Sequence, residues 1–265
     1  MVHLHALSTP MTWRWVMLIA GAFLAGVLNA VAGGGSFLSF PALLNMNMLP
    51  IQANATNTVA IWPGQLTSIA AYWGYLRKNP GSAWLLALSG LLGGTAGALV
   101  LLNTPQKTFL HLVPWLLLIA ASIFAVSGPI SRWLERRKGR TAGQPREPRR
   151  LGVFLVSIVV SFYLGYFGAG AGFLLITTLS LFGYQDLNEI NALKVVTTTT
   201  ANGIAFLIFI AEGQVVWRYC MAAMIAAAIG GYSSASMARR VPQRVLRSIV
   251  VAIGLGMAAW FFWRQ

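Results

Sequence analysis

The residues of this chain that could do chemistry are polar side chains set within long apolar stretches. Lys194 is the one charged group among them, and it is positive. The others carry amide or hydroxyl groups: Asn29, Ser36, Asn57, Gln65, Thr197, Thr198 and Asn202. An ammonium group together with amides and hydroxyls favours an anionic ligand, because each of these groups can donate a hydrogen bond to a negatively charged oxygen. The set therefore predicts an anion-binding site.

Catalytic and metal-binding chemistry find little support in the same sequence. Two of the five acidic residues lie in a basic segment and the other three lie near the ends of apolar segments. No zinc-protease motif H-E-x-x-H and no nucleophile elbow G-x-S-x-G is present. The three histidines and the single cysteine, Cys220, are scattered without the spacing of metal ligands. We therefore predict a protein that is not an enzyme and that needs no cofactor or metal.

The composition is that of an integral membrane protein. Hydrophobic residues make up 57% of the chain and charged residues 9%, whereas soluble domains carry about 25% charged residues. The net charge of +14 does not indicate nucleic-acid binding, because eight of the nineteen basic residues lie between Arg132 and Arg150, as in a cytoplasmic loop. The expected partners are the lipid bilayer and a small anionic substrate, and a homodimer remains open.

Two glycine clusters would position the polar groups. The glycines assigned to the site are Gly33, Gly34, Gly35, Gly168, Gly170 and Gly172. Each cluster interrupts an apolar segment, and backbone amides that leave a helix inside lipid must line a cavity in the protein. Helices that resume at Ser36 and Gly172 would point partially positive N–H groups at an anion. In the alternative interpretation the glycines only allow close packing, and Lys194 extends to the membrane interface.

Apolar segments of about 20 residues predict an all-α, polytopic membrane protein with about eight transmembrane helices. The first and fifth of these segments contain the glycine clusters. The segments span residues 15–44, 53–76, 83–102, 109–127, 151–182, 192–211, 217–237 and 245–263.

The two halves of the chain match at an offset of 137 residues. Gly93-Gly94 corresponds to Gly230-Gly231, and Asn54-Ala55 corresponds to Asn191-Ala192. At this offset Asn57 is equivalent to Lys194 and Gln65 is equivalent to Asn202. The match predicts two homologous four-helix repeats, residues 12–128 and 151–265, joined by a basic cytoplasmic linker, residues 129–150.

Orientation follows from counting spans and basic residues. Four spans return the chain to the side on which it started, which predicts parallel repeats, unless a glycine break is a re-entrant hairpin. With both termini in the cytoplasm, 13 basic residues lie inside and six outside. We therefore predict cytoplasmic termini.

The glycine motifs resemble those of a known family. Gly26-(x)6-Gly33-Gly34-Gly35-Ser36-Phe37, with Pro41 and Ala53-Asn54-Ala55-Thr56-Asn57-Thr58, resembles the first repeat of the TauE/SafE sulfite-exporter family. Gly165-(x)2-Gly168-Ala169-Gly170-Ala171-Gly172-Phe173, with Asn191-Ala192 and Gly213, is similar to the second repeat, with alanine at 169 and 171 as a departure. The resemblance covers nearly the whole chain. It implies a carrier of sulfite, sulfonates or related organic anions in the bacterial inner membrane.

Two functions compete at this point. The first is a secondary transporter of a small anion, with its site between the two glycine breaks. The second is a non-transporting membrane subunit that docks a partner through the basic linker. A polar cavity that solvent can reach would favour the first, and a dry interface the second. The anion, the direction of transport and the coupling ion stay open, although the lack of a deep carboxylate favours facilitated or potential-driven movement.

Overall fold

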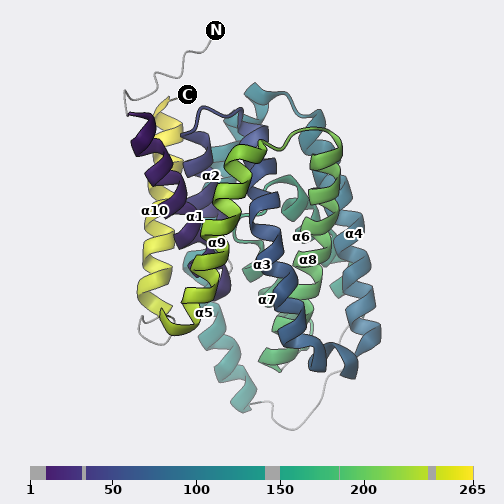
Figure 1. The fold of residues 1–265 in the computed structure, drawn as a ribbon. Coiled ribbons are helices and arrows are strands. Elements are labelled where there is room, and N and C mark those ends of the chain that lie inside the picture. The colour runs from purple at the N-terminus through teal and green to yellow at the C-terminus, as the bar shows by residue number, and fades with distance from the viewer. Residues whose placement is uncertain (1–9, 32–33, 141–149, 185, 238–242, 265) are drawn as a thin grey trace.

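The computed structural model describes residues 10–31, 34–140, 150–184, 186–237 and 243–264, and these residues form ten α-helices with no strand. The helices are α1 (Met11–Val31), α2 (Ser36–Leu44), α3 (Pro50–Lys78), α4 (Pro80–Asn103), α5 (Gln106–Arg140), α6 (Arg150–Tyr166), α7 (Ala171–Leu181), α8 (Leu187–Ala211), α9 (Trp217–Met237) and α10 (Gln243–Arg264). The prediction of an all-α protein is confirmed (Figure 1).

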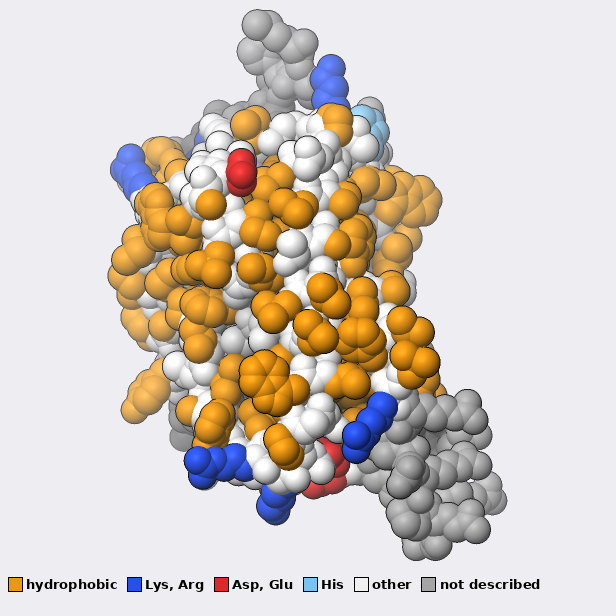
Figure 2. Space-filling model, turned by 90° about the vertical axis from the view of Figure 1, so that its right-hand side faces the viewer, with side chains coloured by type: hydrophobic (Ala, Val, Ile, Leu, Met, Phe, Trp, Pro, Cys, Tyr) orange, Lys and Arg blue, Asp and Glu red, His pale blue; other side chains and the backbone are white. Residues whose placement is uncertain are grey.

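Helix length and surface composition fit a protein that spans a membrane. Met11–Asn29, Pro80–Asn103 and Leu187–Ala211 are each long and apolar enough to cross a bilayer. Large apolar side chains such as Trp84 and Leu207 are exposed on the outside of the bundle. On the face in Figure 2, hydrophobic side chains cover the middle and charged side chains lie towards the two ends. Such a surface suits lipid around the middle and water at both ends.

Both glycine clusters separate two helices that fold back on one another. A Cβ placed on Gly21 of α1 would lie 2.9 Å from the Cβ of Ala42 in α2, so the later part of α2 lies beside the middle of α1. In the second half, a Cβ on Gly152 at the start of α6 would overlap the ring of Phe182, which follows α7. Each pair is therefore an antiparallel helical hairpin.

The hairpins change the predicted topology. Each half contains a hairpin followed by three helices, so it leaves the bundle at the end opposite to the one where it entered. In Figure 1, α1 begins and α10 ends at the top, whereas α5 ends and α6 begins at the bottom. The two halves therefore run in opposite directions. The prediction of parallel repeats is wrong, because it counted each glycine-broken segment as a single span.

The same arrangement separates the linker from the ends of the chain. The end of α5 and the start of α6 lie at the end of the bundle opposite to the start of α1 and the end of α10 (Figure 1). A cytoplasmic linker and cytoplasmic termini cannot both hold, so that combined prediction is wrong. Residues 141–149 of the linker lie outside the described residues.

Glycine holds the main helix pairs at short distances. A Cβ on Gly26 of α1 would overlap the carbonyl oxygen of Ala227 in α9, and one on Gly97 of α4 would overlap the carbonyl oxygen of Phe162 in α6. Helices in lipid associate through close packing rather than through the hydrophobic effect, which favours small residues at their contacts. The contact of α1 with α9 and that of α6 with α4 occupy equivalent places in the two halves.

Candidate anion-binding cavity

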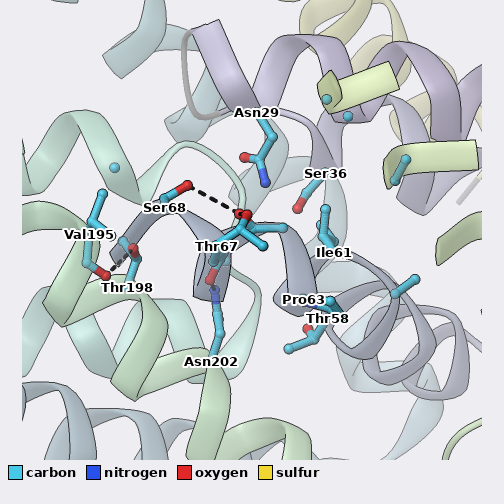
Figure 3. Close-up of a pocket in the computed structure, with 18 of the residues that line it drawn as sticks. Asn29, Ser36, Thr58, Ile61, Pro63, Thr67, Ser68, Val195, Thr198 and Asn202 are labelled. Atoms are coloured by element: carbon cyan, nitrogen blue, oxygen red, sulfur yellow. Dashed lines mark hydrogen bonds between the residues drawn. The ribbon is translucent and has the colours of Figure 1, made fainter. Parts of the chain in front are cut away.

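A cavity of about 620 Å³ lies between the two hairpins and the central helices α3, α8 and α9. Eight of the fourteen predicted site residues line it, and they come from both halves of the chain: Asn29, Ser36, Gln65, Gly168, Gly172, Lys194, Thr198 and Asn202. In the close-up of Figure 3, Asn29 from the end of α1 and Ser36 from the start of α2 point towards the same space. The sequence pattern thus located a real cavity.

The remaining predicted residues do not line this cavity. Asn57 is buried and its side-chain oxygen accepts a hydrogen bond from Ser39, while Thr197 is buried and donates to the carbonyl oxygen of Leu193 in its own helix. Gly34, Gly35 and Gly170 are buried and do not line the cavity, and Gly33 lies outside the described residues. Asn57 and Thr197 therefore support the structure around the cavity.

The two hairpin turns need glycine for different physical reasons. Gly168 and Gly170 have φ angles of 83° and 76°, a left-handed conformation that favours glycine. Ala169 lies between them without a positive φ, and its carbonyl oxygen accepts a 2.8 Å hydrogen bond from Tyr163, so alanine fits there. Gly35 has φ of −57°, but a Cβ on it would overlap the carbonyl oxygen of Ala25. The first turn thus needs glycine because a side chain would collide with α1, and the second needs it because the backbone has positive φ angles.

Two helix starts border the cavity. Ser36 is the first residue of α2 and Gly172 lies in the first turn of α7, and both line the cavity. Neither helix has a side-chain cap at its start. Because the first N–H groups of a helix lack partners within the helix, such starts attract negative charge.

Helices α3 and α8 cross at the cavity through equivalent residues of the two halves. Asn202 donates a 3.0 Å hydrogen bond to the side-chain oxygen of Gln65, and Trp62 donates a 3.0 Å hydrogen bond to the carbonyl oxygen of Thr199. Both pairs join positions 137 residues apart, which is the offset between the halves. Contacts between equivalent residues are typical of a two-fold axis. The crossing of α3 and α8 thus has the pairing of residues that is expected at an approximate two-fold axis.

Lys194 gives the lining of the cavity a positive charge. It is the single charged side chain among the described residues that line the cavity, and it is partly buried. No carboxylate of the described chain lines the cavity with it. No group of His, Cys, Asp or Glu suited to a metal ion is found within the described residues either. The arrangement can therefore attract and hold an anion through one ammonium group and neighbouring dipoles.

The predicted site lacked several residues that α3 and α9 add to the cavity wall, among them Ser68, Tyr72, Met224 and Tyr232. Those of α3 had a usable signal, since Thr58, Gln65, Ser68 and Tyr72 recur at helical spacing on one face of one helix. Those of α9 lie in a run of alanine, methionine and glycine that carries no polar signal.

The cavity opens towards one end of the bundle. Its exposed lining residues, Gly64, Thr67, Ala228 and Tyr232, lie between the middle and the later parts of α3 and α9, which both run to the bottom of Figure 1. Towards the other end the rings of Phe40 and Phe109 pack on that of Phe167, with centroids 5.5 Å and 6.4 Å apart. These rings are buried and close that end of the cavity.

Hydrogen bonds reinforce the closed end. The backbone N–H of Val216, just before α9, donates to the hydroxyl of Thr56 at 3.1 Å. The side-chain amide of Asn54 donates to the carbonyl oxygen of Tyr166 at 3.1 Å. These bonds join α3 to both α9 and the second hairpin at the end of the cavity that the three rings occupy.

Comparisons with known proteins agree with this architecture. The family model described as "Sulfite exporter TauE/SafE" matches residues 18–261. A "Probable membrane transporter protein" of Haemophilus influenzae is 27% identical over 257 residues, covering 94% of each chain. "Probable membrane transporter protein YfcA" of Escherichia coli is 26% identical over 242 residues, covering 90% of this chain and 86% of the relative. No solved structure gives a significant match. The chain is therefore a member of the TauE/SafE sulfite exporter family of membrane transporters.

Proposed function

We propose that the protein is a secondary transporter of a small anion of the sulfite or sulfonate type. The observation that carries this proposal is the position of Lys194, the one charged side chain among the described residues that line a cavity built from both halves of the chain. The family description and the names of the relatives support transport as the activity. The substrate class follows from the chemistry of the cavity together with the family.

In this proposal the anion binds through charge and dipoles. The ammonium of Lys194 supplies the attraction, and the starts of α2 and α7 add partial positive charge from the opposite wall. Asn29, Ser36 and the Gln65–Asn202 pair supply polar contacts. A single lysine balances one negative charge, so singly charged anions such as hydrogensulfite and alkyl sulfonates fit better than doubly charged ones such as sulfate, whose second charge would stay uncompensated in a partly buried site.

We further propose that residues 12–128 and 151–265 are inverted repeats in the bacterial inner membrane. Among the described residues, the end of the bundle where α3, α5 and α9 terminate carries ten basic residues: Arg77, Lys78, Arg132, Arg136, Arg137, Lys138, Arg140, Arg150, Arg244 and Arg247. The opposite end carries Arg14, Lys107, Arg218 and Arg264. The positive-inside rule then favours a cytoplasmic linker, with both termini on the periplasmic side. The cavity would open to the cytoplasm.

The rival function is a non-transporting subunit that docks a partner through its basic linker. That function predicted a dry, packed interface between the two glycine breaks. The polar cavity found there counts against it and supports transport.

A flux assay tests the proposal. The purified protein would be placed in liposomes, and the entry of sulfite, short alkyl sulfonates, sulfate and acetate would be measured with and without an imposed membrane potential. We expect flux of sulfite or a sulfonate above that of empty liposomes, with sulfate much slower. A correctly inserted protein that moves none of these anions would refute the proposal.

A further inference from the structure

The route into the cavity has an equivalent in the other half of the molecule that is closed. On the open side the cavity runs between α3 and α9, where it is lined by Ser68, Tyr72 and Gly231. The offset of 137 residues relates these positions to Ala205 and Phe209 on α8 and to Gly94 on α4.

The equivalent seam between α4 and α8 is tightly packed. The side chains of Ala205 and Phe209 are both 0% exposed. A Cβ on Gly94 would lie 2.6 Å from the carbonyl oxygen of Ala201, and one on Gly90 would overlap the hydroxyl of Thr200. Glycine at 90 and 94 therefore allows α4 to close on α8.

On the open side, close packing of this kind does not explain why Gly64 and Gly231 are glycine. Gly64 of α3 is equivalent to Ala201, and a Cβ placed on it would meet nothing within 4 Å. For Gly231, the equivalent of Gly94, the nearest atom to such a Cβ is 3.8 Å away. Both residues lie inside helices, where glycine is unfavourable by roughly 1 kcal/mol relative to alanine. The pair Gly231 and Gly64 thus has the composition of a close helix contact, but its two members stand apart.

We propose that the cavity has a second access route, between α4 and α8, which opens when Gly231 of α9 closes onto Gly64 of α3. This inference rests on the proposed transport function. The Gln65–Asn202 and Trp62–Thr199 pairs lie at the approximate two-fold axis, so they occupy equivalent places in both states. The closed seam of one state becomes the open route of the other, and the anion meets alternate sides of the membrane.

Cysteine labelling tests the second route directly. Cys220 is the single cysteine of the chain and is buried, so Cys220→Ala provides a background without thiols. In that background Ala205→Cys would be treated with a membrane-impermeant maleimide added from the side of the chain termini. We expect labelling, although the residue is fully buried in this structure, whereas Ser68→Cys should react from the opposite side only.

A bulky residue in the open gap gives the sharper arm of the test. Gly64→Leu should prevent closure, so it should lower the labelling of Ala205→Cys at least about tenfold and stop anion flux. Gly74→Leu is the matched control, because Gly74 lies in the same helix with equally open space but away from the cavity. This control should change neither labelling nor flux.

The outcomes separate this inference from the proposed function. Labelling does not depend on which anion is carried, so a lack of flux for every anion refutes the proposed function alone. Failure of Ala205→Cys to react in a protein that carries flux, or unchanged labelling in Gly64→Leu, overturns the second route. If Ala205→Cys does not fold, Phe209→Cys, the equivalent of Tyr72, replaces it in the same measurement.

Discussion

The two halves of this molecule share one arrangement of helices but differ in the chemistry at equivalent positions. Lys194 of α8 lines the cavity with a charged side chain. Its equivalent in α3, Asn57, is 1% exposed and accepts a hydrogen bond from Ser39. Both halves therefore contribute a similar set of helices around the cavity, but only the second half contributes a charged side chain to its described lining. Lys194 is the one cation among the described residues that line the cavity, which fits the proposed carrier of a single anion.

The largest expected effect comes from removing that charge. Lys194→Gln keeps most of the side-chain volume but loses a charged hydrogen bond worth about 1.5–3 kcal/mol, so anion affinity should fall roughly 10- to 100-fold. Titration calorimetry on the purified protein would measure the dissociation constant. The matched variant Asn57→Ala should lower stability and leave the affinity nearly unchanged. Equal affinities in Lys194→Gln and the parent protein would contradict the assignment of charge to one half.

A second test separates the two glycine turns. Side chains at Gly168 are penalised by its left-handed conformation, by about 1–2 kcal/mol, and asparagine adopts that conformation more readily than valine. Side chains at Gly35 are penalised by overlap with α1, by about 1–3 kcal/mol, and the penalty grows with size. In chemical unfolding, Gly168→Asn should therefore be milder than Gly168→Val, whereas Gly35→Asn should be worse than Gly35→Ala. If Gly35→Asn destabilises the protein no more than Gly35→Ala does, the distinction between the two turns fails.

A third test concerns the hydrogen bond that replaces the charge in the first half. Ser39→Ala leaves the side-chain oxygen of Asn57 buried without this donor, which should lower the free energy of unfolding by about 1–2 kcal/mol. Neither residue lines the cavity, so flux per folded molecule should stay the same. A loss of flux without a loss of stability would give Asn57 a direct role in transport and weaken the comparison.

The smallest effect is expected at the exposed end of the molecule. Asn79, which follows α3, donates a 2.7 Å hydrogen bond to the carboxylate of Glu189 in α8, and the bond is solvent-exposed. Asn79→Ala should change the free energy of unfolding by about 0.5 kcal/mol or less. A much larger change in thermal unfolding would show that the halves are held together at this end rather than at the α3–α8 crossing.

Much of the cavity lining could be predicted because the two halves of the sequence match at a fixed offset. The offset of 137 residues pairs Gln65 with Asn202, and these two side chains do contact each other at the cavity. Lys194 stood out as a lone cation in an apolar helix. Composition was enough to predict a membrane protein, because soluble domains carry about 25% charged residues and this chain carries 9%. Apolar segments of about 20 residues then predicted that it is all-α.

The direction of the chain after each glycine break could not be predicted. A helix that unwinds and continues has the same hydropathy along the sequence as a helix that turns back. The difference lies in contacts such as that between Gly21 and Ala42, which are distant in sequence. One wrong choice, made once in each half, reversed the relation of the repeats.

The side of helix α8 that faces the cavity could not be predicted from the sequence either. Four consecutive threonines, residues 197–200, offer polar groups on every side of the helix. Thr197 is fully buried and bonded to Leu193, whereas its neighbour Thr198 lines the cavity. Only the packing of α8 against α4 and α3 distinguishes them, because adjacent helix positions point about 100° apart.

The position of the bound anion is the most direct test of whether the anion binds in the cavity beside Lys194. A structure determined with a bromine-labelled alkyl sulfonate would locate the ligand by the anomalous scattering of bromine. We predict an anomalous signal inside the cavity, with the sulfonate oxygens in contact with Lys194 and close to Asn202. A signal outside the cavity, or an empty cavity at a concentration that saturates flux, would contradict it.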